Sequence, residues 1–273
     1  MSSLEVDAAM ASPTDITVTQ LCRLIGLPGA PALVDVRSDG EYRANPRLIP
    51  TAQRRCSTSV TKWSQWYAGQ SIVVVCQNGE TLSQAAAARL RYQGLDAQTL
   101  AGGYEAWWAE RRPLVQGHRI PKRDGDGRTV WVTRARPKVV RVACPWLIRR
   151  FIDPDAVFLF VPPSEVAGVA EHANATPFDV DGAFWGDRGK MTTFDVMLEE
   201  FGLDIEPLNR VALIVRGADT GRLDLTPQSA GLLAACLGYS RMYRDDVEQL
   251  NVATAHFDAI YRWSRDATDE RHG

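Results

Sequence analysis

Five consecutive apolar residues at 72–76, Ile-Val-Val-Val-Cys, constrain the fold of this chain more than any other segment. A strand with no polar position must be covered on both faces, which is typical of a central strand in a parallel sheet. A second short run, Ala-Leu-Val-Asp-Val at 32–36, has the same character. Helix-like sequence follows each run, and the segment 82–93 keeps apolar residues at helical spacing up to Gly94. This order predicts an α/β fold, a parallel sheet with helices on both faces.

The second half of the chain carries more helix signals than strand signals. Thr192 and Asp195 resemble a capping box before an apolar helical pattern, and Gly202 follows that pattern as a stop signal. We predict helices at 192–202, 226–238 and 246–263, with strands at 129–133 and 157–161. The second half should therefore be a mostly α-helical α+β domain.

The length of 273 residues predicts two domains. Turn-forming residues are dense between 112 and 138, and this density indicates a linker. We therefore predict an unstructured N-terminus, a first domain, a linker and a second domain at 1–13, 14–115, 116–128 and 129–273, with the boundary near Gly117.

The net charge of −2 conceals a cationic middle segment. Between Arg111 and Arg150, twelve basic residues stand against two acids, Asp124 and Asp126. This segment is either a solvated linker with a charged helix face or a surface that attracts anions. The overall charge balance disfavours a nucleic-acid-binding protein.

The cysteines and the N-terminus bear on the cellular compartment. The five cysteines are scattered and contain no CxxC pair, so we expect neither disulfides nor a compact zinc site. The first fifteen residues contain no Lys or Arg, unlike a secretory signal. The apolar runs are much shorter than the roughly 20 residues that span a bilayer. We expect a cytoplasmic protein with reduced thiols and no membrane partner.

Cys76 is the strongest candidate for a reactive residue. It ends the apolar strand and precedes the loop Gln77-Asn78-Gly79-Glu80-Thr81, after which a helix begins. Ligands of parallel α/β sheets bind at the carboxyl ends of the strands, and backbone amides at a helix N-terminus favour a thiolate. Position alone also allows a structural role, because cysteine is among the most buried residue types.

Four motifs in order make residues 14–115 resemble a rhodanese-homology domain: Leu-Val-Asp-Val-Arg at 33–37, Leu-Ile-Pro-Thr-Ala at 48–52, the Cys76 loop and Leu-Ala-Gly-Gly-Tyr at 100–104. The resemblance implies that Cys76 carries a sulfane sulfur as a persulfide, without a cofactor. It also implies that the loop amides of Gln77, Asn78, Gly79, Glu80 and Thr81 bind that sulfur, and that Asp35 and Arg37 serve the fold and the mouth of the site.

One departure from the family bears on the sulfur donor. Many members carry an arginine where this chain has Thr81, and the loop contains Glu80 instead of a cation. We therefore expect thiosulfate to be a poor donor, and a small-molecule or protein persulfide to be a better one. The loop also lacks the arginine with which related phosphatases bind phosphate.

Four stretches of the second half, at 141–153, 175–179, 186–195 and 215–220, match one known family. On these stretches, residues 129–273 resemble the C-terminal domain of ChrB-type chromate-resistance proteins. Arg141, Arg149 and Arg150 could bind chromate or another oxyanion, or could form the basic face of an amphipathic helix.

A divalent metal is a second candidate ligand of this domain, although no compact ligand spacing supports it. The weak candidate ligands are His172, Asp187 and His256, joined by Asp179, Asp195 and Asp219. Asp195 and Asp219 also have simpler explanations, as a helix-capping residue and a turn residue.

Two functions follow from these resemblances. The first is a sulfurtransferase that carries a persulfide on Cys76, fused to a domain implicated in chromate resistance. The alternative is a non-catalytic protein that binds or senses chromate or a metal, in which the first domain is a scaffold or thiol sensor. A DNA-binding regulator is less favoured, because a basic run alone provides only sequence-independent attraction to phosphates.

Overall fold

The computed structural model describes residues 14–270, so the unstructured segment expected at 1–13 lies outside the described residues. The chain divides into two compact units. Unit 1 comprises the described residues through Ile25 together with Gly29–Asn45 and Ala52–Arg112. Unit 2 comprises Gly26–Pro28, Pro46–Thr51 and the chain from Pro113 onward. Because two short segments of the first half belong to unit 2, the continuous domain limits expected above stay predictions.

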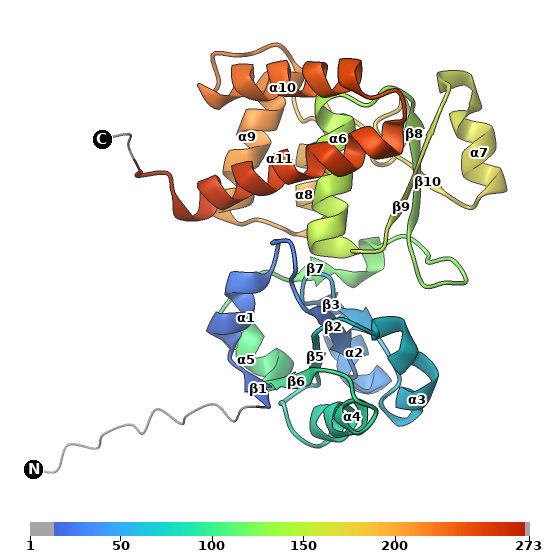
Figure 1. Cartoon of the computed structure of the whole chain (residues 1–273), viewed down its shortest axis with the longest axis vertical. Coiled ribbons are helices and arrows are strands. Elements are labelled where there is room, and N and C mark those ends of the chain that lie inside the picture. The colour runs from blue at the N-terminus through green and yellow to red at the C-terminus, as the bar shows by residue number, and fades with distance from the viewer. Residues whose placement is uncertain (1–13, 271–273) are drawn as a thin grey trace, which may run out of the picture. The chain divides into compact units, whose positions relative to one another are not determined.

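Unit 1 is built on a parallel five-stranded sheet with the strand order β1-β6-β5-β2-β4 (Figure 1). Its strands are β1 (Asp15–Ile16), β2 (Ala32–Asp35), β4 (Gln53–Arg54), β5 (Ile72–Val75) and β6 (Ala97–Leu100). Its helices are α1 (Val18–Leu24), α2 (Asp39–Ala44), α3 (Val60–Trp63), α4 (Thr81–Tyr92) and α5 (Gly103–Ala109), with 3₁₀ turns η1 (Ser57–Ser59) and η2 (Ser64–Tyr67).

The central strand β5 is buried along its whole length. Val74 pairs in register with Val34 of β2 and belongs to a core cluster with Val60 of α3 and Leu90 of α4. Figure 1 shows α1 and α5 on the other side of the strands from α3. The expected parallel sheet with helices on both faces is therefore confirmed, and the absence of polar residues in β5 has its cause in this two-sided cover.

Unit 2 is richer in helix. Its helices are α6 (Val139–Leu147), α7 (Val166–His172), α8 (Thr193–Phe201), α9 (Glu206–Asp219), α10 (Gln228–Met242) and α11 (Asp246–Asp266), with 3₁₀ turns η3 (Gly117–Arg119) and η5 (Pro163–Glu165) and a π-helical turn η4 (Ile148–Ile152). A parallel sheet has the order β10-β8-β9, and β3 pairs antiparallel with β7. These strands are β3 (Arg47–Leu48), β7 (Val115–Gln116), β8 (Val130–Arg134), β9 (Val157–Val161) and β10 (Thr176–Pro177).

Helix α6 forms the centre of unit 2, and nearly all of its side chains are buried. Trp146 of α6 lies against Phe194 of α8 and against Phe257 and Tyr261 of α11, with ring centroids 5.6–6.4 Å apart. These large aromatic contacts explain why a helix that is apolar on nearly every side is stable here.

The expected elements of unit 2 are found, with differences, and helices α7 and α9 were not predicted. The capping box of Thr192 and Asp195 opens α8, and Gly202 ends it with φ 74°. Helix α10 continues past Gly238 to Met242, so the expected end at Gly238 is wrong; glycine only weakens a helix whose packing continues. Asp219, expected in a turn, is the last residue of α9. Strand β10 had no periodic signal, because it is two residues long.

The segment expected as a linker carries ordered structure. It begins within β7, continues through η3 and contains an antiparallel bridge between Arg123 and Thr129. Within residues 14–270, none of the helices is both long and apolar enough to cross a membrane.

Candidate functional site

Cys76 follows β5 directly, at the carboxyl end of the strand. Its residue surface is 2% exposed, and its Sγ lies 3.0 Å from the Oγ of Ser83 on α4. The other hydrogen-bond contacts of this sulfur are with Asn78 Oδ1 at 3.8 Å and the carbonyl oxygen of Glu80 at 4.0 Å. The sulfur is therefore surrounded by oxygen atoms. The Ser83 hydroxyl donates to the carbonyl oxygen of Glu80 at 3.2 Å, so it can donate to a thiolate at Cys76 only by giving up that hydrogen bond. The expected binding of sulfur by the loop amides stays a prediction.

The loop after Cys76 is held by its own side chains. The Oδ1 of Asn78 accepts from the Glu80 amide at 3.3 Å, and the Asn78 side-chain amide donates to the Glu80 carboxylate at 2.7 Å. Gln77 donates to the carboxylate of Glu105 at 3.0 Å, and Thr81 begins α4. The five loop residues predicted from the sequence thus lie together, in a loop whose exposed charge is negative.

Two glycines bring α5 against this loop. Gly79 and Gly103 have φ values of 78° and 58°, and a Cβ on Gly103 would meet the Gly79 nitrogen at 2.4 Å and the Cys76 oxygen at 2.5 Å. The amide of Tyr104 donates to the Cys76 carbonyl at 2.9 Å. Backbone therefore packs directly on backbone beneath Cys76. The Gly-Gly pair at 102–103 was the sequence signal for this support, although its role was not predicted.

Asp35 and Arg37 form a buried ion pair at the end of β2. Each residue is 2% exposed, and the Arg37 guanidinium donates from Nη2 at 2.7 Å and from Nε at 3.0 Å to Asp35 Oδ2. The guanidinium carbon also lies 3.8 Å from the centre of the Tyr104 ring. The pair therefore ties β2 to α5, the helix that supports the Cys76 loop.

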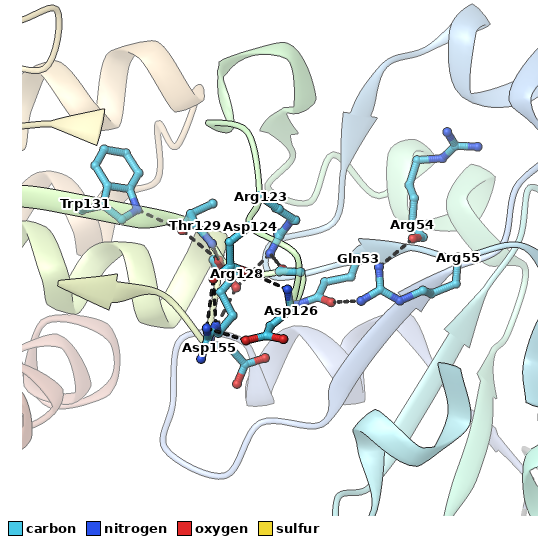
Figure 2. A network of polar contacts seen from close by, with 12 residues as sticks. Gln53, Arg54, Arg55, Arg123, Asp124, Asp126, Arg128, Thr129, Trp131 and Asp155 are labelled. Carbon is cyan, nitrogen blue, oxygen red and sulfur yellow. Dashed lines mark hydrogen bonds and ion pairs between the residues drawn. The ribbon is translucent and has the colours of Figure 1, made fainter. Parts of the chain in front are cut away.

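A cavity of about 350 Å³ opens beside this pair, and it contains a thiol that the sequence reading did not select. Cys56 lines the cavity together with Arg37, Arg54 and Arg55. Hydrogen bonds from the Thr58 hydroxyl and amide and from Ser59 lower the pKa of Cys56. Figure 2 shows Arg55 donating to Gln53 and to the carbonyl of Arg54. The sequence did not single out Cys56, because the cavity forms only where the segment 54–57 lies beside Arg37 and Leu82 in the fold.

Cys56 should be alkylated faster than Cys76 in the folded protein. Cys56 is exposed and its thiolate is stabilised by hydrogen bonds, whereas Cys76 is buried; thiolate fraction and access both set the rate. We expect a rate difference of at least about tenfold with iodoacetamide, measured by peptide mass spectrometry over time. Cys236, with a pKa raised to about 12 by burial, is the internal control for an inert thiol. Faster labelling of Cys76 would contradict this expectation.

The basic run between Arg111 and Arg150 is largely neutralised within the described residues. Eight of its twelve side chains form ion pairs with carboxylates: Arg112, Arg119, Arg123, Arg128, Arg134, Arg136, Arg141 and Arg150. Figure 2 shows part of this network at the start of β8, where Arg128 binds Asp124 and Asp126. The run therefore differs from the solvated linker of the simpler interpretation, because most of its charges are paired within the fold.

The structure does not gather Arg141, Arg149 and Arg150 into one site. Arg141 lies 3.3 Å from Asp179, and Arg150 binds Asp258 through two contacts of 2.7 and 2.8 Å. Arg149 donates instead to Asn251 at 3.0 Å. The three guanidinium groups thus have different partners, Asp179, Asn251 and Asp258.

Two carboxylates, Asp179 and Asp219, act electrostatically on the buried thiol of Cys144 in α6. Asp179 accepts from Arg134 at 3.1 Å, and burial raises the pKa of Asp179. Asp219 accepts from the Val140 amide at 3.3 Å; burial, together with the charge of Asp179, raises the pKa of Asp219 to about 6. Burial and these same carboxylates raise the pKa of Cys144, so this thiol is held protonated.

Asp219→Asn should stabilise unit 2 near pH 7. A carboxyl whose folded pKa lies above its unfolded value adds stability below pH 3.8, and this stability is lost as the pH rises through about 6. The asparagine side chain keeps an oxygen that accepts from the Val140 amide, but it carries no charge. Surrounding protein desolvates the Asp219 carboxyl, but part of the residue still faces solvent, so screening limits the gain to about 1 kcal/mol. Urea unfolding between pH 4 and pH 8 measures the free energy of unfolding of the parent and the variant, with Asp204→Asn as an exposed control. If the free energy of unfolding of Asp219→Asn depends on pH as strongly as that of the parent, the prediction is wrong.

The weak metal candidates lie on separate elements. His172 ends α7, and His256 lies on α11 with a pKa lowered by burial. Asp187 accepts from the amide and hydroxyl of Thr193 at 2.7 and 2.8 Å. Asp195 accepts from Thr192 and from Arg216. Across residues 14–270, no group of three or more His, Cys, Asp or Glu side chains is arranged to hold a metal ion.

Comparison with known proteins gives matches to both halves of the chain. Residues 17–110 match the family described as rhodanese-like domain, and residues 131–264 match the ChrB C-terminal domain. Protein ChrB of Cupriavidus metallidurans is 36% identical over 146 residues, which are 52% of this chain and 43% of that protein. The chain therefore spans less than half the length of this curated relative.

Among solved structures, the chain is similar to a rhodanese-related protein from Thermoplasma volcanium, with 25% identity, a TM-score of 0.33 and coverage of 37% of this chain and 97% of that one. It is also similar to a thiosulfate sulfurtransferase from Pseudomonas aeruginosa, with 25% identity, a TM-score of 0.34 and coverage of 38% and 19%. The family matches lie in chain order and do not overlap. The chain therefore joins a rhodanese-like domain to a ChrB C-terminal domain.

Proposed function

We propose that this protein is a sulfurtransferase that carries a persulfide on Cys76 and acts in chromate resistance, in the cytoplasm. The observation that carries the proposal is the place of Cys76, at the carboxyl end of β5 and before the loop that leads into α4, within a rhodanese-like domain. The proposed role in chromate resistance rests on the resemblance of the second domain to ChrB-type proteins.

The chemistry requires a thiolate and two exchanges. The Cys76 thiolate attacks the terminal sulfur of a donor persulfide, R–S–SH; the new S–S bond forms as the donor's S–S bond breaks, and the donor leaves as RS⁻. An acceptor nucleophile then takes the terminal sulfur with its proton, and Cys76 is released as the thiolate. The Ser83 hydroxyl, 3.0 Å from Sγ, can donate to that thiolate by turning away from the Glu80 carbonyl, its acceptor at 3.2 Å.

The charge around the loop favours a persulfide over thiosulfate as the donor. Glu80 lies in the loop, and Glu105 contacts it through Gln77. Two carboxylates repel a dianion such as thiosulfate, whereas a persulfide group carries one negative charge at most. We therefore expect persulfides of small thiols or proteins to be the donors.

A persulfide-transfer assay tests the proposal. Full-length protein is given a small-molecule persulfide, and sulfur transfer to a thiol acceptor is followed for the parent, Cys76→Ser and Cys56→Ser. We expect Cys76→Ser to reduce transfer to the uncatalysed rate and Cys56→Ser to leave it near the parent rate. Equal activity of Cys76→Ser and the parent would remove Cys76 from the mechanism.

The burial of Cys76 favours a second candidate function. At 2% exposure, the thiol meets reagents slowly, as in a scaffold or a thiol sensor that responds to a conformational change. In that case the second domain would bind chromate or a divalent metal without sulfur transfer. Calorimetric titration of the full-length protein with chromate and with Zn²⁺ or Mn²⁺ distinguishes the two candidate functions. Saturable binding heat from a protein that does not transfer sulfur would support sensing.

A further inference from the structure

Arg149 differs from the other basic residues of the cationic run. Eight of these residues pair with carboxylates, as described above, and Arg111, Lys122 and Lys138 are exposed to solvent. Arg149 is partly buried and forms no ion pair with any carboxylate of residues 14–270. Burial lowers the pKa of Arg149, and the charge of Arg150 lowers it further. A partly desolvated cation of this kind is costly unless an anion compensates it.

Arg149 and Arg150 are consecutive residues of the π-helical turn η4, and their side chains have different partners. Arg150 points to Asp258 of α11 and is satisfied there. Arg149 donates from Nη1 to the side-chain oxygen of Asn251, and its guanidinium carbon lies 5.1 Å from the centre of the Phe158 ring. A single neutral acceptor and one ring leave most of the guanidinium donors available to a ligand.

A cavity of about 510 Å³ adjoins this guanidinium, within the size range of small-molecule sites. Phe158, Val247 and Leu250 give it an apolar wall, and Asn251 adds an amide. Asp155 is the carboxylate in the lining, and it interacts electrostatically with Arg128, beside which Figure 2 labels it. The cavity therefore offers one cation, one amide, one carboxylate that interacts with Arg128, and a largely apolar surface.

We propose that this cavity binds a small organic monocarboxylate, with the carboxylate on Arg149 and the apolar part against Phe158 and Leu250. A guanidinium binds a carboxylate through two parallel hydrogen bonds. A tetrahedral dianion such as sulfate would leave one charge uncompensated and would lie against apolar side chains. The proposed ligand is thus independent of the sulfur chemistry at Cys76.

Calorimetric titration of the full-length protein with hexanoate tests this assignment, with hexanamide as the uncharged analogue and sulfate as the dianion. We expect saturable binding of hexanoate, with hexanamide and sulfate each at least about tenfold weaker. Arg149→Met should weaken hexanoate binding about 10- to 100-fold. Arg241→Met, which removes an exposed arginine from α10, should leave binding unchanged.

Asn251→Asp provides a second variant that keeps the shape of the side chain. The new carboxylate would replace the neutral acceptor 3.0 Å from Arg149 and occupy the guanidinium from within the protein. Hexanoate binding should then be lost while the fold is retained, as checked by circular dichroism. Absence of saturable hexanoate binding to the parent, unchanged binding in Arg149→Met or Asn251→Asp, or tighter binding of sulfate or hexanamide than of hexanoate would each overturn the proposal.

Discussion

Arg37→Met is expected to destabilise unit 1 by about 3–5 kcal/mol. Removing the guanidinium leaves the Asp35 carboxylate, 2% exposed, without its charge partner in a low-dielectric interior. The variant also loses the contact of the guanidinium with the Tyr104 ring, at 3.8 Å. Hydrogen exchange followed by mass spectrometry, read on peptides from β2, β5 and α4, measures the loss within unit 1.

The pair of Glu110 and Arg112 is a matched control for this prediction. It has the same spacing of two residues and similar distances, 2.8 and 3.1 Å, but its side chains are 42% and 35% exposed. Arg112→Met should therefore cost about 1 kcal/mol or less. The double variant Asp35→Asn/Arg37→Met should recover part of the loss, because no buried charge remains. If Arg37→Met and Arg112→Met lower the free energy of unfolding equally, burial of the Asp35–Arg37 pair does not contribute to stability.

Gly103→Ala is expected to be the second strongly disruptive change, at about 2–5 kcal/mol. The added Cβ would lie 2.4–2.8 Å from three backbone atoms, the Gly79 nitrogen and the carbonyl oxygens of Cys76 and Gln77. Backbone cannot rotate away as a side chain can, so the loop after Cys76 must move. We expect lower protection of the 77–81 amides in hydrogen exchange, together with faster alkylation of Cys76.

Gly94→Ala separates the two causes of that effect. Gly94 has φ 80°, and a Cβ there would meet nothing within 4 Å. Its substitution therefore carries only the left-handed backbone strain, about 1–2 kcal/mol. The excess cost of Gly103→Ala over Gly94→Ala measures the close packing of α5 on the Cys76 loop. If the two variants are alike in stability and in Cys76 alkylation, this packing does not hold the loop.

The local patterns of the sequence account for much of the secondary structure. The wholly apolar strand β5, helix α4 up to its Gly94 stop and the capping box of α8 were all predicted, because each depends on residues within one turn or one strand. Helix α10 continues through Gly238 because packing along the helix outweighs a penalty of about 1 kcal/mol for one glycine. A window of neighbouring residues contains no information on that packing.

The candidate site was predicted only as far as its residues are contiguous. The Cys76 loop is one segment, and the structure keeps it together. Ser83 lies in the first turn of α4, beyond the loop, and Cys56 lies in a different loop from Cys76, so neither was identified as a partner of the site. The three arginines of the basic run looked alike in sequence and have different partners in the fold.

The sequence by itself determined the two-part organisation of the fold, the parallel sheet of the first half and the position of Cys76 at a strand end, because periodicity, turn residues and motif order are local properties. Only the tertiary structure decided which charges are neutralised and which thiols are accessible. Ion pairs such as Arg150 with Asp258 join residues more than a hundred positions apart. Charge compensation and solvent access depend on distances between residues that are far apart in the sequence. The packing of helices and strands sets these distances.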